Sequence, residues 1–129
     1  MPKKVLIADD SRFQVQMLSM FLAEKGVEVI AAQDGLQASA LAKRALPDAV
    51  ILDINMPGGS GIEVLKRIRL STNTQHIPVV VVSGNVDTEV EQSAKTLGVM
   101  AFLHKPIDTD ELWTTLSTLL SPNAEHTAL

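Results

Sequence analysis

The sequence contains no cysteine, and this absence excludes disulfides, thiol catalysis and cysteine-ligated zinc. It also lacks any apolar stretch near the roughly 18 residues that cross a membrane, so membrane insertion is not expected. The apolar run 5–8 is too short for a signal peptide, and a cytoplasmic location is therefore expected. Positive charge is scarce, because 15 acidic residues outnumber 11 basic ones, and this argues against direct binding of nucleic acid.

The order of apolar and amphipathic segments predicts an α/β protein. Strand-like runs alternate with helix-like segments five times, which is typical of a parallel sheet covered by helices. The runs 48–53 and 77–82 are almost wholly apolar, as in central strands buried on both faces, whereas Glu28 inside another run suits an edge strand. The five strands are expected at 4–8, 27–31, 48–53, 77–82 and 99–103.

Helix signals fall between these strands. Ser11 and Gln14 fit a capping box, and the helix that they open should run to Lys25, before Gly26. The remaining helices are expected at about 36–45, 61–70, 87–97 and 109–120. The 129 residues suit a single domain with a proper core, which we assign to residues 1–121, followed by a C-terminal tail at 122–129.

The last predicted helix has a core stripe formed by Leu112, Leu116 and Leu119. Trp113 and Leu120 lie at the edge of that stripe. They either widen the buried face, which is the favoured interpretation, or belong to a partner surface, where aromatic anchors are enriched.

Four of the five apolar runs end at polar residues. These are Asp9 and Asp10, Asp53, Ser83, and His104 with Lys105. The carboxyl ends of parallel strands meet at one edge of a sheet, where ligands bind in open α/β folds. The sequence therefore predicts an acidic pocket with one ammonium group, suited to a divalent cation and a phosphoryl group.

The clustering of Asp9, Asp10 and Asp53 itself calls for a cation. Two carboxylates about 4 Å apart repel by roughly 4 kcal/mol at an effective dielectric of 20. Mg²⁺, or another divalent cation such as Mn²⁺, relieves this repulsion and binds carboxylates and phosphate oxygens. Asp53 is the candidate nucleophile, because an ionised carboxylate attacks phosphorus without a general base. Lys105 and the Ser83 hydroxyl, or a nearby backbone amide, would bind the phosphoryl oxygens.

Four segments in this order carry a resemblance to a known family. The chain resembles the receiver domains of two-component response regulators, of the CheY type, from residue 3 to about 120. The resemblance implies a doubly wound, flavodoxin-like sheet of five parallel strands in the order 2-1-3-4-5 with five helices. The matching segments are VLIADDS (5–11), AVILDINMPGGSG (49–61), VVVVSG (79–84) and AFLHKP (101–106).

The resemblance also implies a role for each matching residue. Asp53 is the implied phospho-acceptor for a sensor histidine kinase or a histidine phosphotransfer protein. Asp9 and Asp10, with the backbone carbonyl of Asn55, are the implied metal ligands. Ser83 and Lys105 are implied to bind the phosphoryl group, and Ser83 and Phe102 to switch upon phosphorylation, whereas plain core packing is the alternative for Phe102. The Lys105–Pro106 bond is expected to be cis, which proline permits.

The implied function is a switch that catalyses only its own phosphorylation and dephosphorylation. Phosphorylation adds negative charge and strong acceptor oxygens, and the resemblance implies a response in the fourth helix, fifth strand and fifth helix. No output domain follows residue 120, so we expect a stand-alone receiver whose signal leaves through a protein surface. That surface would bind a downstream protein effector, and it could also support a homodimer.

Two alternatives use the same residues. An aspartate-nucleophile phosphatase related to the haloacid dehalogenases would need a second acid at position 55, where the chain has Asn55, and a cap domain. A phosphate-independent interaction module is the other alternative. A Rossmann dinucleotide site is excluded, because no glycine-rich loop follows the first strand.

Two positions depart from the family pattern. The loop Gly58-Gly59-Ser60-Gly61 lacks the usual bulky apolar residue at Gly59 and an acid at Ser60, so it is conformationally permissive and should alter access to Asp53. Phe102 lacks the hydroxyl of the commoner tyrosine. The histidines, at 76, 104 and 126, show no metal-ligand spacing, although His104 shares a strand face with Phe102.

Overall fold

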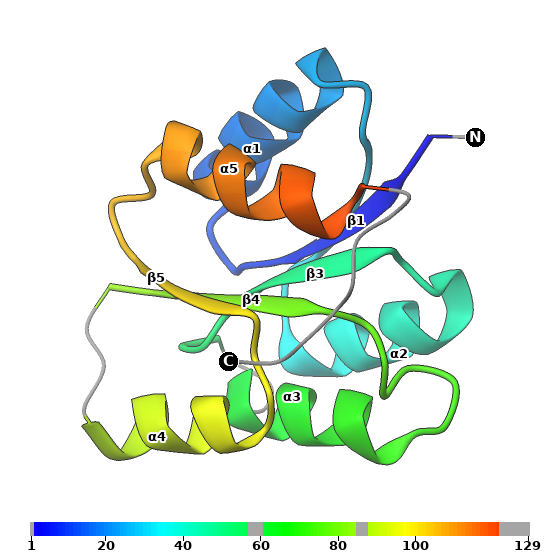
Figure 1. The fold of residues 1–129 in the computed structure, drawn as a ribbon, viewed down its shortest axis with the longest axis vertical. Coiled ribbons are helices and arrows are strands. Elements are labelled where there is room, and N and C mark those ends of the chain that lie inside the picture. The colour runs from blue at the N-terminus through cyan, green and yellow to red at the C-terminus, as the bar shows by residue number, and fades with distance from the viewer. Residues whose placement is uncertain (1, 57–60, 85–87, 122–129) are drawn as a thin grey trace.

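A single parallel sheet lies between two layers of helices in the computed structural model, which describes residues 2–56, 61–84 and 88–121 (Figure 1). The strand order is β2-β1-β3-β4-β5, and every neighbouring pair is parallel, so the predicted topology is confirmed. The strands are β1 (Lys4–Ala8), β2 (Glu28–Ala32), β3 (Ala49–Asp53), β4 (Val79–Ser83) and β5 (Ala101–His104). The edge strand β2 carries Glu28 exposed, whereas β3 and β4 are buried throughout.

The helices that connect the strands cover both faces of the sheet. α1 (Arg12–Glu24) and α5 (Thr109–Leu119) lie on one face, and α2 (Gly35–Ala45), α3 (Gly61–Leu70) and α4 (Thr88–Thr96) lie on the other (Figure 1). Each face buries its own apolar cluster. Leu18, Leu22, Leu112 and Leu116 pack under α1 and α5, and a second cluster, which includes Val64, packs under α2, α3 and α4.

The predicted bounds differ from the observed ones where a backbone group has another partner. β5 begins at Ala101 rather than at residue 99, because the Val99 N–H donates to the Ala94 carbonyl and closes the end of α4. β4 begins after Pro78, which has no N–H for the ladder. Lys25 and Leu120 are the C-caps of α1 and α5 rather than their last helical residues. Position 87 and the tail at 122–129 lie outside the described residues.

Only half of the predicted capping box forms at the start of α1. The Ser11 hydroxyl accepts a hydrogen bond from the Gln14 N–H at 3.2 Å, as predicted. The reciprocal bond is absent, because the Ser11 N–H donates to Asp9 Oδ1 at 2.9 Å instead. The start of α1 is therefore tied to the carboxylate that ends β1.

The side chain of Arg69 ties the end of α3 to α4 and to the segment before β4. Its guanidinium donates to the Leu97 carbonyl at 2.8 Å and to the Gly98 carbonyl at 3.2 Å. It also donates to the carbonyls of Ile77 at 2.8 Å and Gln75 at 3.1 Å. Burial lowers the pKa of Arg69 from its usual value. The buried charge is thus satisfied by backbone carbonyls, which accept from its fixed fork of N–H groups.

Trp113 and Leu120 both contribute to the packed face of α5. Leu120 is buried, and Trp113 is half-buried against the cluster under α1 and α5. The Trp113 ring meets Phe21 of α1 edge to face, with centroids 6.5 Å apart. The Lys25 ammonium lies 5.5 Å from the Trp113 ring centroid. The interpretation that these residues widen the buried face therefore agrees with the structure.

Candidate functional site

The carboxyl ends of the central strands bring the predicted polar residues together. Asp9 directly follows β1, Asp53 is the last residue of β3, and Ser83 is the last residue of β4. Lys105 directly follows β5, where its N–H donates to the Ser83 carbonyl at 2.8 Å. Because β1, β3, β4 and β5 are successive neighbours in the sheet, residues from distant parts of the chain meet at one edge.

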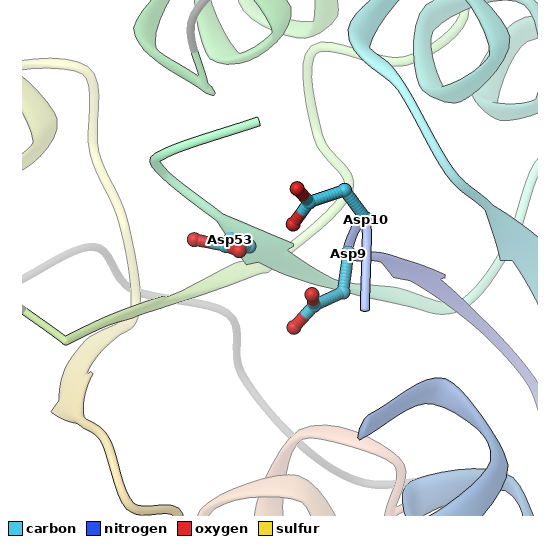
Figure 2. Close-up of side chains that lie close together, drawn as sticks. All are labelled: Asp9, Asp10 and Asp53. Atoms are coloured by element: carbon cyan, nitrogen blue, oxygen red, sulfur yellow. The ribbon is translucent and has the colours of Figure 1, made fainter. Parts of the chain in front are cut away.

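Three carboxylates form the centre of this site. Figure 2 shows Asp9 and Asp10 at the end of β1 beside Asp53 of β3. One ligand oxygen from each residue lies within 4.8 Å of the other two, and this is the only such metal-ligating group in the described part of the chain. Asp9 is 3% exposed and Asp53 is 4% exposed, whereas Asp10 is exposed. The cluster is therefore sheltered by the protein on one side and open to solvent at Asp10.

The ammonium of Lys105 joins two of the carboxylates. Its Nζ lies 3.2 Å from Asp9 Oδ2 and 3.2 Å from Asp53 Oδ2. Three carboxylates and one ammonium leave the group with a net charge of −2 when all are ionised. The Lys105–Pro106 bond is cis, as the resemblance implied.

Backbone and side-chain donors fix the remaining oxygens. The Asn55 N–H donates to Asp53 Oδ1 at 3.0 Å, so both oxygens of Asp53 are held. The Asn55 side chain donates from Nδ2 to the Ser83 Oγ at 3.2 Å. This link between Asn55 and Ser83 was not predicted, because only the backbone carbonyl of Asn55 was considered. The one feature of the sequence that could have indicated this link is the polar side chain at position 55, two residues after the candidate nucleophile.

Burial and charge shift the ionisation of two of these groups in a consistent way. Desolvation raises the pKa of Asp9 above its usual value, partly offset by the Ser11 N–H and by Lys105. Burial alone would lower the pKa of Lys105, but attraction to Asp53 and Asp9 outweighs it, and the pKa of Lys105 is raised. The ammonium is therefore held in its charged form, while Asp9 is a carboxylate whose charge is costly without a further cation.

Phe102, the remaining predicted switch residue, lies on β5, the strand that Lys105 follows. Phe102 is half-buried on β5, opposite Val81 rather than Ser83, and its ring centroid lies 5.5 Å from that of His104. It also packs against the cluster under α2, α3 and α4, as the core-packing alternative requires. The Gly58-Gly59-Ser60 part of the loop lies outside the described residues, as does residue 126.

Gly61 has a steric role that the sequence did not reveal. It begins α3, and its N–H donates to the Ile54 carbonyl at 2.9 Å. A Cβ at this position would lie 2.4 Å from the Ile54 Cα, which no side chain can occupy. Glycine is therefore required here by close backbone approach, immediately beside the strand that ends in Asp53.

The fold and the site define a doubly wound α/β domain with a cluster of acids, one ammonium and one hydroxyl at its strand ends. The model of the response regulator receiver domain matches residues 5–117, and the chain belongs to this family. It is a CheY-like receiver domain of two-component signalling, as its residues indicated.

Relatives and solved structures agree with this assignment. The polar-differentiation response regulator DivK of Brucella anthropi is 31% identical over 120 residues, which cover 93% of this chain and 98% of DivK. The structure of the chemotaxis protein CheY4 of Vibrio cholerae is 35% identical with a TM-score of 0.85, covering 93% of this chain and 100% of that one. The receiver domain of the sensor histidine kinase PA1611 of Pseudomonas aeruginosa, 24% identical with a TM-score of 0.82 over 91% of this chain and 96% of its own, shares the fold.

None of the described helices has both the length and the apolar composition needed to span a membrane.

Proposed function

We propose that this receiver accepts a phosphoryl group on Asp53 in a reaction that depends on Mg²⁺. The observation that carries the proposal is the position of the Asp53 carboxylate. One of its oxygens accepts from the Asn55 N–H at 3.0 Å, the other lies 3.2 Å from Lys105 Nζ, and two more acids lie within 4.8 Å. A nucleophile, a metal-ligand set and a phosphate-binding cation are thus combined in one pocket.

The residues present fit a hard divalent cation. The closely spaced carboxylates keep a net charge of −2 although Lys105 pairs with both Asp9 and Asp53, and a hard divalent cation offsets such a charge. Asp9, Asp10 and Asp53 would hold the ion, with the backbone carbonyl of Asn55 as a further ligand. When bound, the ion supplies positive charge that stabilises the phosphoryl oxygens during transfer. The PA1611 receiver has a magnesium ion coordinated in its active-site cleft.

In the transfer step, a carboxylate oxygen of Asp53 forms a bond to phosphorus. The bond between phosphorus and the donor atom breaks, and its electron pair leaves with the donor, so that an acyl phosphate remains on Asp53. Lys105 then pairs with a phosphoryl oxygen, because its ammonium already lies beside Asp53 Oδ2 at 3.2 Å. Ser83 Oγ accepts from Asn55 Nδ2, so the Ser83 hydroxyl keeps its own proton for donation to the phosphoryl group.

The donor is a histidine kinase or a histidine phosphotransfer protein, and we assign its contact surface to α1. This helix begins three residues after Asp9 and exposes an apolar stripe formed by Phe13, Met17 and Met20. Phe13 is 74% exposed, and the stripe lines a hollow of about 200 Å³. A stripe at i, i+4 and i+7 fits the face of a partner helix. Its position would bring the donor to the acidic pocket.

The signal leaves through the surface of α4, β5 and α5, which binds a downstream effector or a second copy of the chain. α4 supports this role because only Ala94 of that helix is fully buried, so its packing is light. The same helix follows Ser83 in the chain by a few residues. A shift of Ser83 toward the phosphoryl group would therefore act on the least anchored helix of that face.

The test uses Mg²⁺ with acetyl phosphate and intact-mass measurement. We expect one phosphoryl adduct on the parent, none on Asp53→Asn and none when Mg²⁺ is removed by chelation. Asp34→Asn is the matched control, because Asp34 is the N-cap of α2 outside the pocket and asparagine caps equally well. It should be modified like the parent. Absence of the adduct from the parent would leave a phosphate-independent interaction module as the better description.

A further inference from the structure

The C-terminal ends of α2 and α3 form a surface that the proposed function does not use. It consists of Lys43, Arg44 and Leu46 from the end of α2, with Arg67 and Leu70 from the end of α3; we call it the basic-leucine patch. A hollow of about 340 Å³, lined by Lys43, Arg67, Leu70 and Ser71, joins the two helices. Both helix ends lie at the edge of the sheet where β1 begins, opposite the edge that carries the acids (Figure 1).

The cations of this patch have no ion-pair partner in the part of the chain that the structure describes. Lys66, Lys95 and Lys105 each pair with an acid, but Lys43, Arg44 and Arg67 make no ion pair or hydrogen bond within the described ranges. This is unexpected in a chain with four more acids than bases. Cations at helix C-termini are favoured by the helix dipole, which explains their presence at these ends. It does not explain the leucines beside them.

The two leucines are placed against local preference. Leu70 is 83% exposed and Leu46 is 51% exposed. Leu46 also caps α2 in the left-handed conformation, with φ of 48°, a position usually taken by glycine or asparagine. Pro47 follows it, and a residue before proline avoids helical conformations. An exposed leucine held at a strained position is the kind of local conflict that marks a functional surface.

We propose that the basic-leucine patch docks an acidic, leucine-bearing segment of a partner protein, and that it does so independently of phosphorylation. Charge complementarity identifies the partner: three uncompensated cations attract carboxylates, and the hollow with Leu70 receives an apolar side chain. Three cations and two exposed leucines fall short of the larger basic cluster and broad apolar helix face that membrane association requires, so a protein segment is favoured over a lipid surface. Its distance from the acidic edge leaves Asp53 accessible while the partner is bound.

The probes are three labelled 15-residue peptides built on one helical pattern. The first combines leucine at i, i+3, i+4 and i+7 with glutamate elsewhere; the second replaces glutamate by lysine; the third replaces leucine by serine. We expect only the first to bind the full chain saturably in fluorescence anisotropy at low salt. Its amide shifts in NMR should centre on 43–46 and 67–71. Phosphorylation by acetyl phosphate, or Asp53→Asn, should leave its affinity unchanged.

Variants with matched controls test the assignment residue by residue. Arg67→Glu should weaken the first peptide about tenfold, because attraction becomes repulsion, whereas Arg12→Glu, the same charge reversal at the opposite edge of the sheet, should not. Leu70→Ser should weaken it, whereas Leu36→Ser, at the exposed opposite end of α2, should not. Leu46→Asn is decisive, since it relieves the left-handed leucine: we expect a higher melting temperature together with weaker binding. A purely structural leucine would give the first effect alone.

Each contrary result overturns the proposal. Absence of saturable binding by the acidic peptide, equal binding of the lysine peptide, or shifts centred on α1 or α4 would show that the patch does not dock such a segment. Self-association in sedimentation that Leu70→Ser removes would assign the patch to a second copy of this chain. Salt-sensitive sedimentation with phosphatidylglycerol vesicles, lost in Arg67→Glu and without peptide binding, would assign it to an anionic lipid surface.

Discussion

Replacing Asp10 by asparagine should make the metal-free protein more stable, although it removes a proposed metal ligand. Asp10 is exposed, and its side chain makes no hydrogen bond or ion pair within the described ranges, so the substitution removes repulsion without removing an observed contact. Asparagine has the same shape, which keeps changes in packing small. The charge of the pocket falls from −2 to −1 when one of its three carboxylates is lost.

The expected gain follows from Coulomb's law. At the 4.8 Å limit of the cluster, two unit charges in bulk water repel by about 0.9 kcal/mol, and Asp10 has two such neighbours. Lys105 attracts Asp10 and offsets part of the total, so a net gain of about 1 kcal/mol is expected. For a chain of 129 residues this raises the melting temperature by about 3–5 °C.

The measurement is thermal and urea unfolding in EDTA and again in Mg²⁺. An ion at a concentration of 100 times its dissociation constant stabilises the folded state by about 2.7 kcal/mol, which favours the parent because Asp10→Asn binds the ion more weakly. We therefore expect the order of stability to reverse between the two buffers. Lower stability of Asp10→Asn in EDTA would refute the reasoning, because repulsion would then not dominate the pocket.

The variant Asp110→Asn is the control for the change in net charge. Asp110 is an exposed acid in the first turn of α5, and its loss changes the net charge of the chain by the same amount. An acid at a helix N-terminus interacts favourably with the helix dipole. This variant should therefore lose about 0.3–1 kcal/mol in both buffers, so that opposite signs for the two substitutions identify the pocket as the cause.

Three further predictions concern other parts of the structure. In metal-free buffer the contribution of Asp9 to the free energy of unfolding should rise as the pH falls from the raised pKa of Asp9 in the folded state toward the ordinary value of about 3.9. The reason is that only the folded state binds the proton in that pH window. The affinity for Mg²⁺, measured by titration at each pH, should fall over the same range. Gly61→Ala should lower the free energy of unfolding in urea by about 2–4 kcal/mol, because the new Cβ would meet the Ile54 backbone. Gly26→Ala, which has open space around it but φ of 77°, should lower it by about 1 kcal/mol. Equal losses for the two variants would contradict the steric argument. Arg69→Met should speed hydrogen exchange of amides at the end of α4 more than at its start, because the bonds to the Leu97 and Gly98 carbonyls are lost.

The acidic site was largely predictable because four of the five strands change from apolar to polar residues at their carboxyl ends. Once parallel strands were predicted, Asp9, Asp53 and Ser83 had to lie at one edge. What the sequence could not give were contacts made by side chains across the fold. The bond from Asn55 to Ser83 and the bond from Arg69 to Leu97 each join residues 28 positions apart, without a local pattern.

Local predictions failed where two partners compete for one group. The capping box of α1 was predicted from Ser11 and Gln14, but the Asp9 carboxylate takes the Ser11 N–H. Likewise the N–H of Val99 closes α4 instead of extending β5. Hydrophobic periodicity identifies the elements, but hydrogen-bond competition sets their ends. Close backbone approach, as at Gly61, leaves no sequence signal beyond the glycine itself.

The contact between Lys105 and Asp9 spans 96 positions of the chain and has a consequence for synthesis. The carboxylates at positions 9, 10 and 53 leave the ribosome well before the ammonium that neutralises two of them. A nascent chain with its first three strands formed would therefore carry an acidic cluster without its own cation. Free Mg²⁺ in the surrounding solution would bind this intermediate, so the ion that we assign to phosphoryl transfer should also assist folding of the growing chain.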